Sequence, residues 1–361
     1  MRLRNLTITV LAAVTTASCW ATGQPQLTGA KLVERSAKTG VQAAIQEIMK
    51  ADKGPAWIAY SAPVIPGEHH MCCYRWERMS GNSACCGSCR LDSRNHDVSF
   101  VDHVGDCKAT LASVFFVFMR FESESIGQVR AFSTDCAIDA PGLTVYWLQD
   151  VEPAQSVAYL ESLLKQENSP RRGENDEILS AIALHAGTQA TAALERLVQP
   201  GQTSKLRGQA AFWIGSTRGG HGLDVLFALI KSDQDGEFVE QAVFAISQNE
   251  EHERAFGELI RLARQDPRHD VREHSLFWLA QEAGQKAAGT ITDAIENDPD
   301  TDVKKKAVFA LSEMPREEGV PLLIDQARKN RNPVVRKEAI FWLGQSEDPR
   351  ALDFITSILE H

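Results

Sequence analysis

A cluster of cysteine and histidine residues near the N-terminus is the part of the sequence best suited to chemistry. Five of the eight cysteines lie between positions 69 and 91, and His69 and His70 precede them. Thiolate and imidazole groups bind zinc, paired thiols exchange electrons, and oxidised cysteines join loops covalently. The cluster is therefore compatible with a metal site, a redox centre or a set of structural disulfides.

The zinc interpretation requires four converging ligands, which zinc proteins usually supply as two Cys-x-x-Cys pairs. The sequence has one such pair, Cys86 and Cys89, and the spacing of the other candidates is not a recognised zinc pattern. The remaining ligands would come from Cys72, Cys73, His69 or His70.

The redox interpretation uses the same pair, because Cys86 and Cys89 have the spacing of a thiol–disulfide exchange site. A reactive thiol needs a helix N-terminus or a nearby cation that lowers its pKa. The residues around the pair are typical of a loop, and no thioredoxin-like βαβ pattern follows them. A metal-binding or thiol-redox site within 69–107 is the alternative function.

The N-terminus favours disulfides instead. Arg2 and Arg4 precede a short apolar run over 6–17, and small residues follow, which is the plan of a secretory signal peptide at 1–23. Cleavage is expected near Ala21 or Gly23. A lipid anchor through Cys19 is a minor alternative, because a threonine stands where lipoprotein signals usually carry leucine. Thiols of an exported protein, periplasmic or secreted, meet an oxidising compartment.

Seven cysteines remain after cleavage, and we expect them to form structural disulfides. An odd number leaves at least one thiol unpaired or joined to another chain. The candidates are Cys72, Cys73, Cys85, Cys86, Cys89, Cys107 and Cys136.

Charge and motifs exclude several classes of function. The net charge is −10, and loss of Arg2 and Arg4 takes it to −12, which disfavours a nucleic-acid partner. No apolar run after the signal is long enough to span a membrane. The sequence has no nucleotide-binding glycine loop, no zinc-protease motif and no serine-hydrolase motif. We therefore expect neither a cofactor nor a catalytic residue.

The segment 24–150 is expected to form a Cys-rich, mainly β or α+β domain. A helix is predicted within 31–52, with its best part at 41–48. The run at 114–121 is aromatic and β-branched on both faces, which is typical of a central strand covered on both sides. Further strands are predicted at 57–60, 98–101 and 143–148, and a hairpin at Ile126 and Gly127 leads into 129–132.

A repeated sequence unit dominates the segment 151–361. Five phenylalanines, each inside an apolar helical stretch, follow one another at a nearly constant interval. A second apolar helix follows each of them, so each unit is a two-helix hairpin that must stack on its neighbours to bury its apolar face. The five are Phe212, Phe244, Phe277, Phe309 and Phe341, and 181–184 is an earlier, diverged copy.

Two stretches identify the repeat class. Asp300-Thr301-Asp302-Val303-Lys304-Lys305-Lys306-Ala307 and the related Asn332-Pro333-Val334-Val335-Arg336-Lys337-Glu338-Ala339 resemble HEAT repeats, in particular the short type first associated with phycobilisome lyases. The resemblance covers about 175–361 and implies an all-α solenoid of two-helix repeats. Ankyrin and tetratricopeptide signatures are absent. Bilin attachment is not expected, because the export signal points away from cytoplasmic chromophore chemistry.

The recurring residues of the repeats are interpreted as structural. We expect the aromatic ones to form the core between repeats, because they recur at one register of an apolar helix face. A basic residue five positions before four of the phenylalanines is expected to pair with an acid or a helix C-terminus of the adjacent repeat. The predicted core residues are Phe212, Trp213, Phe244, Phe277, Trp278, Phe309, Phe341 and Trp342.

These observations favour an exported interaction protein. A disulfide-linked N-terminal domain precedes a HEAT-like solenoid, and solenoids present extended surfaces to other proteins. The partner is expected to be a protein of unknown identity.

Overall fold

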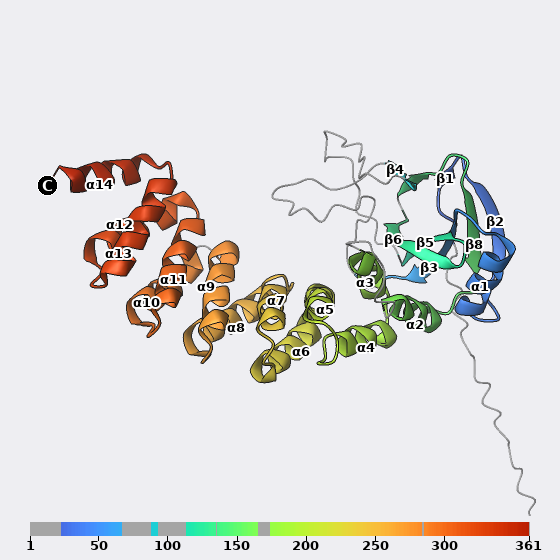
Figure 1. Cartoon of the computed structure of the whole chain (residues 1–361), viewed down its shortest axis with the longest axis horizontal. Coiled ribbons are helices and arrows are strands. Elements are labelled where there is room, and N and C mark those ends of the chain that lie inside the picture. The colour runs from blue at the N-terminus through green and yellow to red at the C-terminus, as the bar shows by residue number, and fades with distance from the viewer. Residues whose placement is uncertain are drawn as a thin grey trace, which may run out of the picture.

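The computed structural model describes residues 23–66, 88–92, 113–134, 136–164, 174–283 and 285–360. Figure 1 shows a sheet domain at one end, from which a curved row of helices extends to the C-terminus. The predicted signal peptide and the predicted strand at 98–101 lie outside the described residues. The observed fold is the predicted one, an α+β domain followed by an all-α solenoid.

A five-stranded mixed sheet forms the centre of the N-terminal domain. Its strand order is β2-β8-β3-β5-β6, with β8 parallel to both β2 and β3, and with antiparallel pairs between β3 and β5 and between β5 and β6. The strands are β2 (Lys31–Ser36), β3 (Ala56–Pro63), β5 (Val114–Glu122), β6 (Ser125–Ser133) and β8 (Thr144–Gln149).

Both faces of this sheet are covered, as the sequence of β5 predicts. Phe115 and Val117 point to one core, whereas Phe116 and Phe118 point to the other, because side chains alternate along a strand. The second core also contains Trp57 and lies beneath a smaller parallel sheet. That sheet has the order β1-β7-β4 and consists of β1 (Leu27–Thr28), β4 (Ser88–Arg90) and β7 (Ala137–Asp139).

Two local predictions in this domain are corrected. The segment 31–36 is the strand β2 and not the start of a helix, because it pairs with the far more C-terminal strand β8. The hairpin between β5 and β6 turns at Ser123, whose φ is 59°, and at Glu124, so Ile126 and Gly127 lie inside β6. The helix predicted at 41–48 and the remaining strands predicted within the described residues are confirmed.

Helices cover the remaining face of the large sheet. The contacts come from α1 (Val41–Ala51), α2 (Pro153–Leu164) and α3 (Glu174–Leu184), and α3 packs directly on β6. Their apolar side chains belong to one buried cluster that continues through the helical repeats as far as Phe354. The sheet domain and the solenoid therefore share a hydrophobic core.

The helices after α2 form pairs, as the repeat predicts. The first helices of the pairs are α3, α5 (Ser204–Thr217), α7 (Gly236–Ser247), α9 (His269–Ala283), α11 (Thr301–Glu313) and α13 (Pro333–Gln345). The second helices are α4 (Thr188–Leu197), α6 (Gly219–Ser232), α8 (His252–Gln265), α10 (Gln285–Asn297), α12 (Arg316–Lys329) and α14 (Pro349–Leu359).

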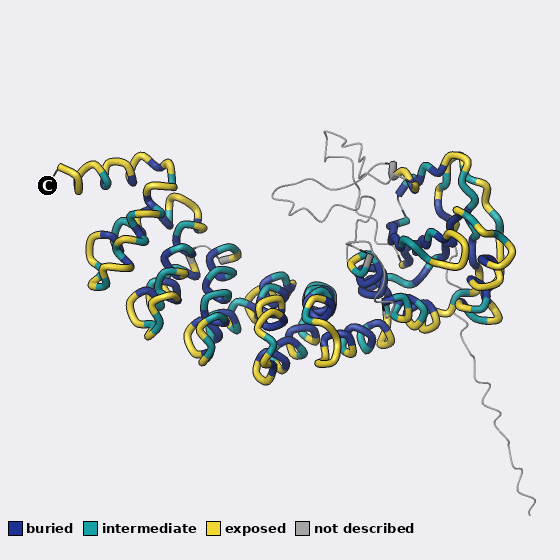
Figure 2. The backbone as a smooth tube through the Cα atoms, in the orientation of Figure 1, coloured by how far each residue is buried: buried dark blue, intermediate teal, exposed yellow. Residues whose placement is uncertain are grey.

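The two sets of helices form two layers. Each first helix packs on the first helix of the next pair, and together they make the first layer. The second helices make the second layer, and α8 and α10 lie below α9 and α11 in Figure 1. Figure 2 shows that the helix faces between the layers are buried, whereas the loops at the ends of the helices are exposed.

Candidate functional site

A continuous row of aromatic rings crosses the first layer of helices. Phe212 stacks on Phe244 with ring centroids 5.7 Å apart and planes 10° apart, and Phe277 stacks on Phe309 at 6.0 Å and 7°. Tryptophan rings connect these pairs. The full row, called the aromatic ladder below, consists of Phe212, Phe244, Phe277, Trp278, Phe309, Phe341 and Trp342.

Tryptophan rings make the connections between neighbouring helices. Trp278 lies 4.6 Å from Phe244 and 4.9 Å from Phe277, so it joins α7 to α9. Trp342 makes the same two contacts, at 4.8 Å to Phe309 and 5.0 Å to Phe341. The ladder therefore runs from α5 to α13 as one set of touching rings.

The ladder lies at the edge of the core and not inside it, which corrects the predicted core position. Trp213, which follows Phe212, is 5% exposed, but every ladder ring is partly exposed and Phe341 reaches 53%. The residues around each ring are the true core, because a step of one residue turns a helical side chain by about 100°. Leu276 and Leu279, which flank two ladder rings, are completely buried.

Small residues two positions before each phenylalanine allow the first helices to approach closely. All five are completely buried, and four are alanine. Their short side chains let adjacent helices touch, and that close spacing brings successive rings into contact. They are Ala210, Ala242, Ser275, Ala307 and Ala339.

The recurring basic residues fix each first helix to the loop that precedes it. Each donates to a backbone carbonyl near the C-terminal end of the preceding second helix, which confirms the predicted pairing with helix ends. The contacts are Arg207 Nε to Val198 at 3.0 Å, Arg272 Nη1 to Asp266 at 2.9 Å, Lys304 Nζ to Ile295 at 3.0 Å and Arg336 Nη1 to Asn330 at 2.8 Å.

Two of these bases also form buried ion pairs with the aspartate that follows the second helix of their own pair. Arg272 donates from Nε and Nη2 to Asp298 at 2.8 and 3.0 Å, and Arg207 pairs with Asp233 in the same way. The predicted pairing with an acid is thus confirmed at both positions, although each acid follows the second helix of the base's own pair and does not belong to an adjacent repeat. The orientation of the ladder is fixed by these contacts.

A second periodic row, not recognised in the sequence analysis, organises the same loops. An Asp or Asn after each of four second helices, α6, α8, α10 and α12, accepts a hydrogen bond from the backbone N–H two residues later, which is an Asx turn. Its members recur at the same interval as the phenylalanines, and that interval would have revealed it. The row is Asp233, Asp266, Asp298 and Asn330, and the bonds are 3.0, 3.0, 2.9 and 2.9 Å long.

The middle of the ladder is acidic. The helices α7 and α9 contain no lysine, and their single arginine, Arg272, is the buried one engaged by Asp298. Glu240 and Glu273 lie one helical turn before Phe244 and Phe277, on the same face. Burial raises the pKa of the Glu273 carboxyl above its usual range, although the nearby charge of Lys306 lowers it.

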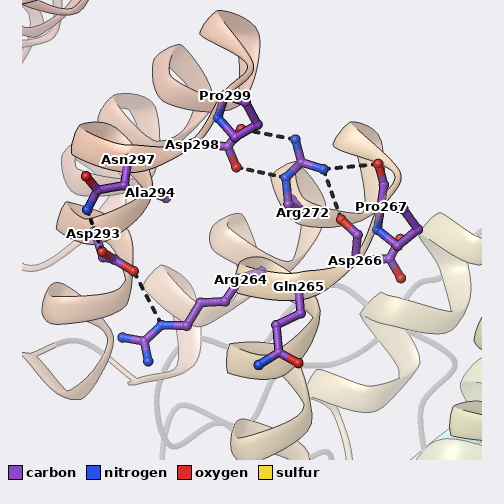
Figure 3. Close-up of a pocket in the computed structure, with 11 residues that line it drawn as sticks. Arg264, Gln265, Asp266, Pro267, Arg272, Asp293, Ala294, Asn297, Asp298 and Pro299 are labelled. Atoms are coloured by element: carbon purple, nitrogen blue, oxygen red, sulfur yellow. Dashed lines mark hydrogen bonds and ion pairs between the residues drawn. The ribbon is translucent and has the colours of Figure 1, made fainter.

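A crevice of about 370 Å³ opens between α8 and α10, on the second layer (Figure 3). Arg272 and Asp298 form part of its wall, and Arg264 faces Asp293 across it with 3.7 Å between Nε and Oδ2. Asp266, the other acid of the lining, pairs with Arg268 at 2.9 Å. Because its charged groups are engaged by one another, the crevice serves to hold loops together.

A buried polar chain connects the sheet domain to the first repeat. The hydroxyls of Tyr60 and Ser156 lie 2.7 Å apart, and Ser156 lies 2.9 Å from Nε2 of His185. Nδ1 of His185 lies 2.6 Å from the carbonyl of Ala181, which assigns the proton to Nδ1. All three side chains are completely buried, so this serine–histidine pair is inaccessible to a substrate.

Of the predicted cysteine sites, two residues fall in the described part of the chain. Cys89 lies in β4, and Cys136 is buried and disulfide-bonded. Among the described residues there is no group of three or more potential metal ligands, and no helix long and apolar enough to cross a bilayer. The other candidates lie outside them, namely Cys72, Cys73, Cys85, Cys86, Cys107, His69 and His70.

Comparison with known families identifies the end of the helical region. Residues 290–361 match the HEAT-repeat family. The preceding helical pairs, from α3 to α9, continue the same two-layered architecture. No curated protein matches the chain in sequence.

Solved structures with similar helical repeats cover about half of the chain. Human deoxyhypusine hydroxylase in complex with glycerol is 18% identical over 56% of this chain and 77% of its own, with a TM-score of 0.25. YibA of Escherichia coli is 21% identical over 52% and 70%, with a TM-score of 0.35.

The complex of CpcE and CpcF of phycocyanin lyase from a Nostoc species is also similar. It is 17% identical over 57% of this chain and 81% of its own, with a TM-score of 0.29. Because all three TM-scores lie below 0.5, these similarities carry no functional argument for the present chain.

Proposed function

We propose that the chain is an exported scaffold that binds another protein along the first layer of its HEAT-type solenoid. The observation that carries the proposal is the aromatic ladder, in which partly exposed rings touch one another from α5 to α13. A row of partly exposed rings across five helices of the first layer lowers solubility unless a partner covers it. Contiguous apolar surface of this kind marks interaction sites in soluble proteins.

The ladder has the composition of a binding surface. Phenylalanine and tryptophan are enriched where proteins meet, because each buries a large apolar area with few rotatable bonds. The buried anchors beneath it, such as the pair of Arg272 and Asp298, hold successive helices in register. A rigid surface loses little conformational entropy on binding.

Export is the second part of the proposal, and it is supported by the sequence. Residues 1–23 have the plan of a signal peptide, and seven cysteines follow it. The bonded state of Cys136 fits an oxidising compartment. A periplasmic or secreted location follows for the mature chain.

Site-specific photocrosslinking tests the scaffold function. A photoreactive amino acid at Gln248 or Gln281, one turn after two of the ladder rings, should form an adduct with a discrete protein of the envelope or secreted fraction. The same group at Glu296, exposed on α10 of the second layer, should give none. The adduct should be lost when Phe244→Ala and Phe277→Ala are combined. Equal adducts from both layers, or none from the ladder, would refute the proposal.

A further inference from the structure

The charge around the middle of the ladder indicates the chemistry of its partner. Five carboxylates belong to α7 and α9, and no lysine or exposed arginine accompanies them on these two helices. Glu240 is 49% exposed at its side chain, and the partner described for it is His274, 3.6 Å away. The five acids are Glu237, Glu240, Asp270, Glu273 and Glu282.

These acids lie beside two of the ladder's phenylalanines, whereas Lys305 and Lys337 hold the equivalent position one turn before Phe309 and Phe341. Glu240 and Glu237 precede Phe244 by one and two helical turns, and Glu273 and Asp270 precede Phe277 by the same intervals. Each of these two rings, Phe244 and Phe277, therefore has two carboxylates along its own helix. An aromatic face beside a carboxylate attracts a cation through two interactions, one with the ring quadrupole and one with the negative charge of the carboxylate.

Glu273 supplies an independent indication. Burial against its neighbours raises the pKa of its carboxyl, so its negative charge is less well solvated than that of an exposed glutamate. Lys306 of α11, His269 and His274 lower this pKa and Asp302 raises it, but the effect of burial is larger. A cation bound beside Glu273 would supply the stabilisation that water does not.

The dimensions of the ladder select an extended ligand. The rings occur on five neighbouring helices of the first layer, and helices packed at about 9 Å give a row roughly 35 Å long. An extended polypeptide advances about 3.3 Å per residue, so about 11 residues would span it. A phosphate backbone would be repelled by the acids, which removes nucleic acid as an occupant.

We propose that the aromatic ladder, with the carboxylates of α7 and α9, binds an extended lysine- or arginine-rich segment of a partner protein. This inference rests on the proposed scaffold function and names the chemistry of the partner. The aliphatic stems of the basic residues lie on the rings, and their charged ends reach Glu240 and Glu273. The aromatic contacts supply the affinity, and the carboxylates select cations over anions.

Peptide binding to the full mature chain tests the proposal. The probe is a fluorescein-labelled peptide, long enough to span the ladder, in which lysine alternates with serine, and its counterpart has glutamate in place of lysine. The lysine peptide should raise the fluorescence anisotropy on titration, and its affinity should fall as salt is added. The glutamate peptide should not bind. Absence of binding, or equal binding of the two peptides, would overturn the proposal.

Variants locate the binding site. The combination Glu240→Gln and Glu273→Gln should weaken the lysine peptide by roughly tenfold, and Phe244→Ala with Phe277→Ala should do at least as much. The matched control is Glu253→Gln with Glu296→Gln, which removes two exposed charges from the second layer and should change nothing. Equal losses in both acid variants would show a non-specific charge effect and contradict the proposal.

Two further measurements separate this inference from the scaffold function. Bound lysine peptide should lower the pKa of Glu273 in a carboxyl NMR titration, which a change of fold would not do. The lysine peptide should also suppress the photocrosslink at Gln248. If the crosslink forms and the peptide does not compete with it, the scaffold function stands and the cationic partner is excluded.

Discussion

Arg272 of α9 and Asp298, which follows α10, form a bidentate ion pair that joins the two ends of one helical repeat. The side chain of Arg272 is 10% exposed and that of Asp298 is 5% exposed, so the pair lies almost entirely inside the protein. Arg272 also donates to the carbonyls of Asp266 and Pro267 in the preceding loop. One guanidinium therefore connects two loops that lie on either side of its own helix.

Replacement of Arg272 by alanine should destabilise the solenoid strongly. Asp298 would be left buried without its cation, which typically costs about 3–5 kcal/mol. Urea unfolding followed by tryptophan fluorescence measures the loss, because Trp278 lies in the same helix. The combination Arg272→Met and Asp298→Leu should recover much of the stability, since it removes both charges. The control is Lys286→Ala, which breaks an exposed ion pair with Glu253 and should cost little stability. An equally large loss of stability in this control would contradict the importance of burial for the pair of Arg272 and Asp298.

Replacement by alanine should affect Leu276 and the adjacent Phe277 differently. Leu276 is completely buried, so Leu276→Ala should lower the free energy of unfolding by about 3 kcal/mol. Phe277 is only partly buried, and its replacement should cost about 1 kcal/mol while it weakens partner binding. Urea unfolding and crosslinking yield, measured on both variants, decide the matter. A larger loss of stability for Phe277→Ala than for Leu276→Ala would show that the ladder rings belong to the core.

The pH dependence of stability should contain a contribution from His185. Burial lowers the pKa of this imidazole to about 4, against 6.5 for an ordinary histidine, and the charge of Arg218 also lowers it. The unfolded chain therefore takes up a proton at a pH where the folded chain does not. The contribution of neutral His185 is complete above pH 6.5 and is lost as the pH falls towards 4. The loss should reach about 3 kcal/mol.

His185→Gln isolates this contribution from that of the carboxylates. The amide of glutamine does not titrate in this range, so the variant should lose less stability than the wild type between pH 7 and pH 4. Urea unfolding at both pH values gives the difference. Identical losses in the two proteins would mean that His185 is already protonated in the folded state.

The cysteines give a chemical test of export. Purified mature protein should begin near residue 22 or 24, should contain no stoichiometric zinc, and should show one free thiol on titration under denaturing conditions. Mass spectrometry of unreduced peptides should find Cys136 in a disulfide. Zinc bound in stoichiometric amount, or seven free thiols, would support the metal or redox alternative for 69–107.

The helical repeats could be predicted because their signal is periodic and local. The regular interval between the phenylalanines fixes the length of the hairpin, and the apolar spacing fixes its helices. The partners of the basic residues, represented by Arg272, are predictable as well, since a charged side chain at a recurring helix position needs a recurring partner. The row that includes Asp298 is equally periodic, and its interval carries the same information.

The remaining errors arise from contacts between distant residues. The strand at 31–36 pairs with the strand at 144–149, and the residues of 31–36 alone do not predict this pairing. The depth of the ladder rings depends on how far each helix is rotated about its axis. A rotation of a few tens of degrees moves Phe277 from the core to its edge without changing the sequence period.

The hydrophobic core that the sheet domain shares with the solenoid has a consequence for the order in which the chain unfolds. At one end, β6 covers α3, and Val129 donates its backbone N–H to Glu177 at 3.3 Å. At the other end, Leu352 and Leu359 of α14 are 65% and 83% exposed. Opening should therefore begin at α14 and travel repeat by repeat towards the sheet. Amide hydrogen exchange should slow progressively from α14 to α3. The solenoid would then open easily at its C-terminal end and resist opening where it packs on the sheet.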